Sequence, residues 1–302
     1  MTEELTIAEK LLQLYECEGF EVHTGWNPYH LNNWRDAQFT YLKKDGKPLN
    51  TGGGGLSWQE IPCIELIGKC ISPRRILIIG NSFGWSTLLC SLVWPTAEVV
   101  AMDCGFLPPA DGAQKLLAKT LSSIRNEPAT YSDDPFFGIN LTNYLSNKNG
   151  LKAKAVISTS PNDIEFVVLN HFSGKPDFVF IDGYHISPQV MLDFDGAARF
   201  ADDNCVYLFH DIINWHLRDA FDACKSKSKL DGGLLWRTPS GMGLLYPPEY
   251  PSLGRVMSAF GGSECELDSL KPKIRRWKAA SFFEQHVLQS ASLKKIKDLI
   301  FK

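Results

Sequence analysis

The chain has 302 residues, of which 44% are hydrophobic and 22% are charged, so its length and composition fit one large α/β domain with additions or two smaller domains. The formal net charge of −3 argues against a general nucleic-acid-binding protein, because such proteins are usually basic. No apolar run reaches the length of a membrane span, and the first ten residues are too acidic and polar for a secretory signal. We therefore expect neither a nucleic acid nor a membrane as a partner.

The eight cysteines are scattered along the chain, and no two of them form a Cys-x-x-Cys pair. Cys90 and Cys205 lie in apolar runs, as small core residues do. This usage favours a reduced, cytoplasmic protein over a disulfide framework.

Residues 1–56 read as an N-terminal extension. Apolar residues at helical spacing predict an amphipathic helix within residues 3–18. Residues 26–41 then interleave aromatic and polar side chains, and four consecutive glycines follow at 52–55. Two interpretations stay open: a lid whose aromatic side chains contact a substrate, or an extension that packs these side chains on the main domain.

The main domain begins at residue 57. Ser57 to Glu60 form a capping box, which predicts a helix. The β-branched run Ile76 to Ile79 predicts a strand buried on both faces, and Gly80 and Gly84 bracket a tight loop before an apolar, helical stretch. Strand, glycine loop and helix form a nucleotide-binding turn, because glycine lets the main chain approach a ligand and the helix N-terminus offers free N–H groups. The G-x-x-x-G spacing is neither a dinucleotide fingerprint nor a P-loop.

Further strands follow at regular intervals, separated by helical patterns. They are predicted at Ala97–Met102, Lys152–Ser158, Phe178–Ile181 and Cys205–Phe209, with a closing hairpin of Leu234–Arg237 and Met242–Tyr246. This order predicts an α/β fold over residues 57–246: a doubly wound, mostly parallel, seven-stranded sheet with a C-terminal antiparallel hairpin. Residues 247–302 read as a helical tail, whose basic cluster at 271–278 is either a contact for an acidic partner or a solvated surface.

Polar residues stand at the predicted carboxyl ends of these strands, where open α/β sheets bind ligands. Asp103 ends the second strand, 19 residues beyond Gly84, where a ribose diol would be held; the alternative is a simple turn residue, which this spacing makes less favoured. Ser158, Thr159 and Ser160 end the third strand and would either bond an adenine or its ribose, or cap the next helix.

Asp182, His210 and Asp211 end two strands that should be neighbours in the sheet. Two carboxylates and an imidazole at one edge would suit Mg²⁺, Mn²⁺ or another divalent cation that lowers the pKa of a substrate hydroxyl. The alternative is that the two carboxylates cap helices while His210 packs. His185, three residues after Asp182, is either a general base or a structural residue.

Four segments in order resemble the successive motifs of class I S-adenosylmethionine-dependent methyltransferases. They are ILIIGNSFGWST, AEVVAMD, DFVFIDGYH and VYLFHD, and the I-D-G-x-H segment resembles the small-molecule O-methyltransferase-like group. The resemblance implies a Rossmann-like methyltransferase fold, S-adenosylmethionine as cofactor and a small-molecule acceptor. The cofactor-binding residues that it implies are Gly80, Asn81, Ser82, Gly84, Ser86, Asp103, Ser158, Thr159, Ser160 and Asp182.

The resemblance also implies a reaction: direct displacement at the methyl carbon, in which the enzyme aligns the reactants and removes a proton. Asp182, His185 or a cation held by Asp182, His210 and Asp211 would handle that proton. His210 stands where this group more usually has Asp or Glu, and Ile78 stands where many members carry a carboxylate. The sequence leaves two alternative functions open: a nicotinamide-dependent oxidoreductase and a non-catalytic protein that binds S-adenosylmethionine. It also leaves a homo-oligomeric state open.

Overall fold

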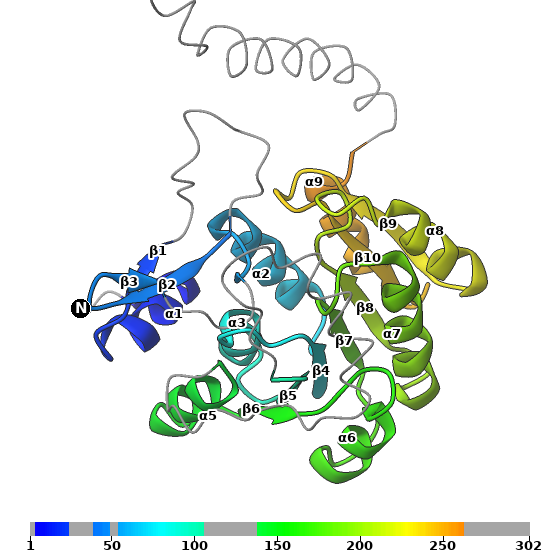
Figure 1. The fold of residues 1–302 in the computed structure, drawn as a ribbon. Helices are drawn as coiled ribbons and strands as arrows, with labels where there is room; N and C mark the ends of the chain where they lie inside the picture. The colour runs from blue at the N-terminus through cyan, green and yellow to red at the C-terminus, as the bar shows by residue number, and fades with distance from the viewer. Residues whose placement is uncertain (1–3, 24–38, 49–53, 106–137, 263–302) are drawn as a thin grey trace, which may run out of the picture.

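The computed structural model describes residues 4–23, 39–48, 54–105 and 138–262 (Figure 1). The helices are α1 (Ile7–Glu16), the 3₁₀ turn η1 (Trp58–Glu60), α2 (Ile61–Cys70), α3 (Trp85–Val93), α5 (Gly138–Lys148), α6 (Ile164–His171), α7 (Ser187–Phe200), α8 (Arg218–Lys227), η3 (Pro251–Leu253) and α9 (Gly254–Phe260). The strands are β1 (Glu21–His23), β2 (Tyr41–Lys44), β3 (Lys47–Pro48), β4 (Arg75–Ile79), β5 (Glu98–Asp103), β6 (Ala153–Ile157), β7 (Phe178–Ile181), β8 (Val206–Phe209), β9 (Asp231–Leu235) and β10 (Met242–Tyr246). Most of the predicted aromatic lid and the basic cluster at 271–278 lie outside the described residues.

The main sheet has seven strands in the order β6-β5-β4-β7-β8-β10-β9. The first five strands are parallel, and β10 runs antiparallel to both of its neighbours. The prediction of a doubly wound sheet with a C-terminal antiparallel hairpin is therefore confirmed. The chain places β5 and β6 on one side of β4 and then β7 and β8 on its other side, so the strand order reverses between β4 and β7. Sheets of this kind bind ligands at such a reversal.

The hairpin prediction was wrong in its first strand, which covers Asp231–Leu235 and not Leu234–Arg237. Thr238 explains the shift, because its hydroxyl donates to the carbonyl of Leu235 at 2.7 Å and accepts from the N–H of Met242 at 2.8 Å. These bonds close a turn over residues 236–241, so the strand must end before it.

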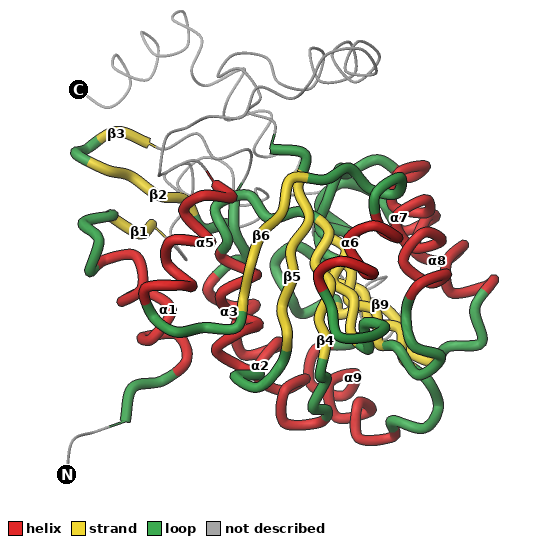
Figure 2. Tube along the Cα trace, turned by 90° about the horizontal axis from the view of Figure 1, so that it is seen from below, coloured by secondary structure: helices red, strands yellow, loops and turns green. Residues whose placement is uncertain are grey.

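Two layers of helices cover the sheet (Figure 2). Helices α2, α3, α5 and α9, with α1 beyond them, share one hydrophobic core, and α6, α7 and α8 share the core on the other face. Strand β4 shows the alternation: Ile76 and Ile78 belong to the first core, whereas Leu77 and Ile79 belong to the second. A strand buried on both faces needs apolar residues at every position, which is why this run reads as continuous.

The described part of the N-terminal extension packs against the main domain. Leu11 and Tyr15 of α1 are fully buried, and the Tyr15 hydroxyl donates to the carbonyl of Phe83 at 3.2 Å. Strands β1, β2 and β3 form a separate antiparallel sheet that continues from α1. The extension is thus anchored beside the loop that follows β4.

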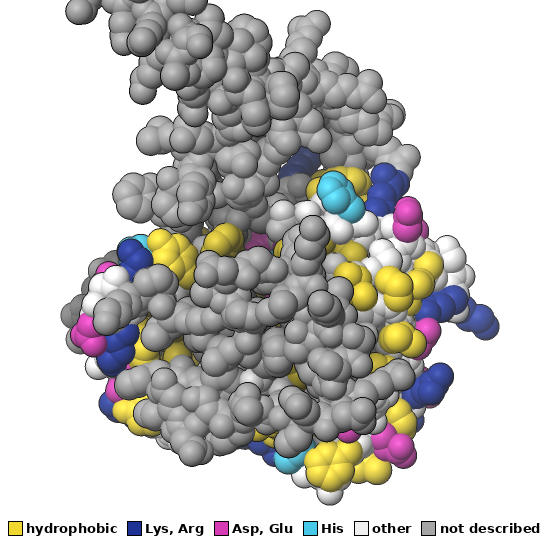
Figure 3. Space-filling view, in the orientation of Figure 1, with side chains coloured by type: hydrophobic (Ala, Val, Ile, Leu, Met, Phe, Trp, Pro, Cys, Tyr) yellow, Lys and Arg dark blue, Asp and Glu magenta, His cyan; other side chains and the backbone are white. Residues whose placement is uncertain are grey.

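The described surface exposes apolar side chains over α6 (Figure 3), where Phe166 is 59% and Leu169 is 70% accessible.

Among the described residues, no helix is both long enough and apolar enough to cross a membrane. Cys63, Cys90, Cys205 and Cys224 are buried and free, which confirms that Cys90 and Cys205 are core residues.

Candidate active site

The loop after β4, residues 80–84, which we call the glycine loop, is fixed by its main-chain geometry. Gly80, Ser82 and Gly84 have φ values of 97°, 46° and 91°. A β-carbon at Gly80 would lie 2.0 Å from the main-chain oxygen of Asp182, and one at Gly84 would lie 2.1 Å from Oγ1 of Thr142. Both positions therefore require glycine, for conformation and for space.

Asp103, at the end of β5, holds the glycine loop by its carboxylate. Its Oδ2 accepts from the N–H of Asn81 at 2.8 Å and of Ser82 at 3.1 Å, and its Oδ1 accepts from the N–H of Gly105 at 2.9 Å. Three main-chain donors thus fix the orientation of this side chain. A ribose contact from Asp103 stays a prediction, and the structure adds a second role in shaping the loop.

Asn81 and Ser86 are buried. The Oδ1 of Asn81 accepts from Thr87 Oγ1 at 3.0 Å, and its Nδ2 donates to Thr142 Oγ1, also at 3.0 Å. The Asn81 side chain therefore ties the loop to α3 and α5, and a cofactor contact from Asn81 or Ser86 stays a prediction. Thr142 was not predicted as a site residue, because no local pattern in α5 distinguishes a residue whose side chain contacts a distant loop.

The hydroxyl residues after β6 contact α6 and α7. The N–H of Thr159 donates to the Asp163 carboxylate at 2.7 Å, at the start of α6, and the Ser160 hydroxyl donates to Asp193 Oδ1 at 2.6 Å. Gln189 donates to the same oxygen at 2.7 Å. Burial raises the pKa of Asp193, although these two hydrogen bonds oppose the shift. Contacts of residues 158–160 with an adenine stay a prediction.

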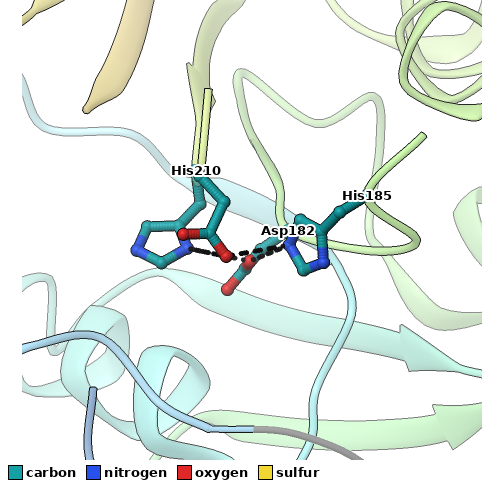
Figure 4. A group of neighbouring side chains, drawn as sticks. Asp182, His185 and His210 are labelled. Carbon is teal, nitrogen blue, oxygen red and sulfur yellow. Dashed lines mark hydrogen bonds and ion pairs between the residues drawn. The ribbon is translucent and has the colours of Figure 1, made fainter. Parts of the chain in front are cut away.

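Four side chains from the ends of β7 and β8 converge, and we call them the acid–histidine cluster: Asp182, His185, His210 and Asp211. Asp182 Oδ1 lies 3.1 Å from His210 Nδ1 and 3.4 Å from His185 Nε2. Asp211 Oδ2 lies 3.1 Å from His185 Nε2 and 3.4 Å from His210 Nδ1. In Figure 4 the two imidazoles lie on either side of Asp182. The structure therefore brings the predicted metal ligands together and adds His185 to them.

Local structure orients two members of this cluster, Asp211 and His185. Asp211 has a φ of 60°, a left-handed conformation that Asp tolerates better than most residues. The ring of His185 stacks on Trp215 at 5.3 Å between centroids and 11° between planes. The exposed side-chain fraction rises from 9% for His210 to 26% for His185, so His185 is the more accessible imidazole.

The cluster is held by opposite charges. Burial alone would raise the pKa of Asp182, but His210 and then His185 outweigh it and lower that pKa to about 2. Burial alone would lower the pKa of His210, but the carboxylates of Asp182, Asp211 and Glu60 raise it well above its ordinary value. The pKa of Asp211 is lowered, because His210 outweighs the burial of the carboxyl. Without a cation, these groups form an imidazolium surrounded by carboxylates.

Glu60 is the site residue that sequence reasoning assigned to a local role. Its Oε2 accepts from the N–H of Ser57 at 2.8 Å, as the capping box predicted, and also lies 3.1 Å from Nε2 of His210. Its side chain is only 1% exposed. The capping pattern identified the residue, but its approach to β8 depends on packing between segments 150 residues apart.

Residues 77–212 match the family model described as a methyltransferase domain. No curated protein sequence matches the chain. An O-methyltransferase from Bacillus cereus, solved in complex with SAH, is 11% identical with a TM-score of 0.50, over 82% of this chain and 93% of that one.

Two further solved structures are similar. The O-methyltransferase TomG from Streptomyces achromogenes, solved with SAM, is 12% identical with a TM-score of 0.47, over 81% of this chain and 90% of that one. A putative O-methyltransferase from Klebsiella pneumoniae is 10% identical with a TM-score of 0.48, over 82% and 91%. The match to the Bacillus cereus structure shows the fold, and the family model assigns β4 through β8 to a methyltransferase domain.

Proposed function

We propose that the chain is a class I S-adenosylmethionine-dependent methyltransferase that methylates an oxygen of a small molecule with the help of a divalent cation, a proposal supported by the family model and by the fold. One observation carries the proposal: the main chain at Gly80 packs directly on Asp182. The glycine loop and the acid–histidine cluster are therefore adjacent, as a methyl donor and a proton acceptor must be.

The residues at the strand ends fit the cofactor. Left-handed conformations in the glycine loop let its main chain approach a ligand, and Asp103 lies beside that loop at the end of β5. S-adenosylmethionine supplies a methyl group on a sulfonium, already activated toward an oxygen nucleophile. What remains for the protein is to align the acceptor and to take its proton.

The acid–histidine cluster can take that proton. Asp182 stays ionised at neutral pH because its pKa is about 2, and His185 is the most exposed of the four side chains. Asp182 and Asp211 both contact Nε2 of His185, at 3.4 and 3.1 Å, so Nδ1 is the nitrogen that would accept a proton from an acceptor hydroxyl. We assign His185 as general base and Asp182 as the residue that orients it.

The same cluster fits a divalent cation. One ligand atom from each of the four residues lies within 4.8 Å of the others. Asp182, Asp211 and the imidazole of His210 would hold the cation, and His185 would be left to accept the proton. This donor set favours a transition ion such as Mn²⁺ over Mg²⁺, because imidazole is a borderline-soft ligand. A bound cation would lower the pKa of an acceptor hydroxyl and favour its alkoxide.

A calorimetric titration of the full chain with S-adenosylhomocysteine tests the cofactor. We expect micromolar binding by the wild type and at least about tenfold weaker binding by Asp103→Ala, since the side chain acts on the ribose and on the loop. Asp202→Ala is the matched control. The Asp202 carboxylate also accepts a main-chain N–H, from Asn204 at 3.0 Å, but it precedes β8 and so lies at the amino end of that strand. Unchanged affinity in Asp103→Ala would remove Asp103 from the cofactor site.

A further inference from the structure

Glu60 links three segments that are far apart in sequence. Its Oε1 accepts from the N–H of Ser240 at 3.1 Å and from the Ser240 hydroxyl, in the turn between β9 and β10. Its Oε2 accepts from the N–H of Ser57 at 2.8 Å and contacts His210 Nε2 at 3.1 Å. Glu60 and Ser240 both lie outside the methyltransferase family model, which spans residues 77–212.

The hydrogen-bond directions around Glu60 fix Nε2 of His210 as a donor, so Nδ1 is the nitrogen that can exchange its proton for a cation. Each carboxylate oxygen already accepts a main-chain N–H, from Ser240 or from Ser57, so both oxygens act as acceptors. Nε2 of His210 must therefore donate to Glu60. Nδ1 is then the nitrogen that faces Asp182 at 3.1 Å and Asp211 at 3.4 Å.

This arrangement is the one that a metal-bound histidine needs. A ligating imidazole presents one nitrogen to the metal and donates the N–H of the other to a carboxylate, which fixes the tautomer and the ring orientation. Glu60 lies on the Nε2 side of His210, and the acid–histidine cluster lies on the Nδ1 side. The position of Glu60 is also buried almost completely, so water does not compete for Nε2.

From these contacts we infer that Glu60 is a positioning residue that holds Nδ1 of His210 as a ligand for a divalent transition-metal cation. The inference rests on the proposed function, because it deepens the cation site of the same cluster. It assigns a metal-site role to a residue that precedes the segment matched by the family model, and it ties the turn at Ser240 to that site.

The first experiment compares Mn²⁺ and Zn²⁺ affinities of full-length variants by calorimetry. Glu60→Gln keeps the size of the side chain, but in the orientation that retains both Ser240 bonds its amide nitrogen faces Nε2 of His210 and the N–H of Ser57, and it opposes the donating tautomer. We expect this variant to bind either ion about 10- to 100-fold more weakly. Ser240→Ala is the matched control: it removes one bond to Glu60 and leaves His210 untouched, so we expect an affinity within about threefold of the wild type.

The second experiment does not depend on a variant that folds. Two-bond ¹H–¹⁵N spectra of the Zn²⁺-loaded wild type should show Nδ1 of His210 bound to the metal and Nε2 protonated. Coordination through Nε2 would overturn the inference. So would a Glu60→Gln variant with wild-type affinity, or an equal loss of affinity in Glu60→Gln and Ser240→Ala, which would indicate a structural role alone.

Titration with S-adenosylhomocysteine separates this inference from the proposed function. A wild type that binds this ligand but neither Mn²⁺ nor Zn²⁺ would overturn the role of Glu60 and leave the cofactor site standing. Metal binding that depends on Glu60, in a protein that does not bind the ligand, would support the inference and contradict the proposed function.

Discussion

The glycine loop and the acid–histidine cluster touch each other, yet they are stabilised differently. The loop is held by main-chain conformation and by N–H groups that donate to Asp103. The cluster is held by ion pairs between two carboxylates and two imidazoles. A loop with no room for a side chain places a ligand rigidly, whereas a group of coupled charges can accept a proton or a cation.

Two carboxyl groups, of the partly buried Asp182 and the buried Asp193, show the same contrast. Asp182 faces imidazoles, which lower its pKa to about 2, whereas Asp193 faces the hydroxyl of Ser160 and the amide of Gln189, and burial raises its pKa. Both lie near the carboxyl ends of the strands, so depth alone does not set their charge. The neighbouring groups decide which carboxylate is available for chemistry.

The largest expected effect comes from filling the space at Gly80. Gly80→Ala places a β-carbon 2.0 Å from a main-chain oxygen and 2.7 Å from its carbonyl carbon, in a left-handed conformation. We expect the free energy of unfolding in urea to fall by more than about 3 kcal/mol. Gly150→Ala is the control, because its φ of 64° is also positive but no atom of the described residues lies within 4 Å of the added β-carbon, so only about 1 kcal/mol should be lost. Equal losses would contradict the packing of Gly80 on Asp182.

Asp182→Asn tests the charges of the cluster without changing its shape. The amide cannot supply the carboxylate that orients His185 and pairs with His210. An acceptor would first be identified by screening hydroxyl-bearing small molecules with radiolabelled cofactor. With that acceptor, we expect the kcat of methyl transfer to fall at least about 100-fold in the variant. The affinity for S-adenosylhomocysteine should stay within about threefold, because the change affects the transition state. A fully active variant would remove Asp182 from the mechanism.

Thr142→Val tests the support of the glycine loop from α5. The substitution keeps the shape but leaves the buried Nδ2 of Asn81 without its bond to Oγ1. We expect the free energy of unfolding to fall by about 1 to 3 kcal/mol, the cost of an unsatisfied buried donor. Thr142→Ser retains the hydroxyl and should lose less. If the serine variant is the less stable of the two, the methyl group and not the hydrogen bond supports the loop.

The smallest expected effect is a pH-dependent one at Asp193. Because the folded state raises the pKa of this carboxyl, its contribution to stability is full below the unfolded pKa of about 3.9 and is lost as the pH rises through the folded pKa. Asp193→Asn stays neutral, so its melting temperature at pH 7 should be slightly above that of the wild type. The difference should shrink as the pH falls toward 4. A difference that grows in acid would reverse the assigned direction of the shift.

Sequence reasoning was most successful where a pattern is short. The β-branched run of β4, the glycines after it and the capping box at Ser57 each follow from a few neighbouring residues, and the structure contains all three. The predicted meeting of Asp182, His210 and Asp211 also succeeded, because parallel strands that are neighbours end at one edge. The roles of Glu60 and Thr142 could not be predicted, since each depends on a contact between helices and loops whose relative positions come from core packing.

Local pattern in the chain was therefore enough to specify the parallel strands of the main sheet and the edge where their polar residues gather, because burial on two faces and glycine-dependent turns leave clear marks in composition. Long-range packing specified the contacts within that edge. It brought Glu60 to Nε2 of His210, His185 to Asp211 and Gly80 to Asp182, all at distances of a few ångströms. Such distances depend on how two helix layers settle on a twisted sheet, and no spacing along the chain encodes that arrangement.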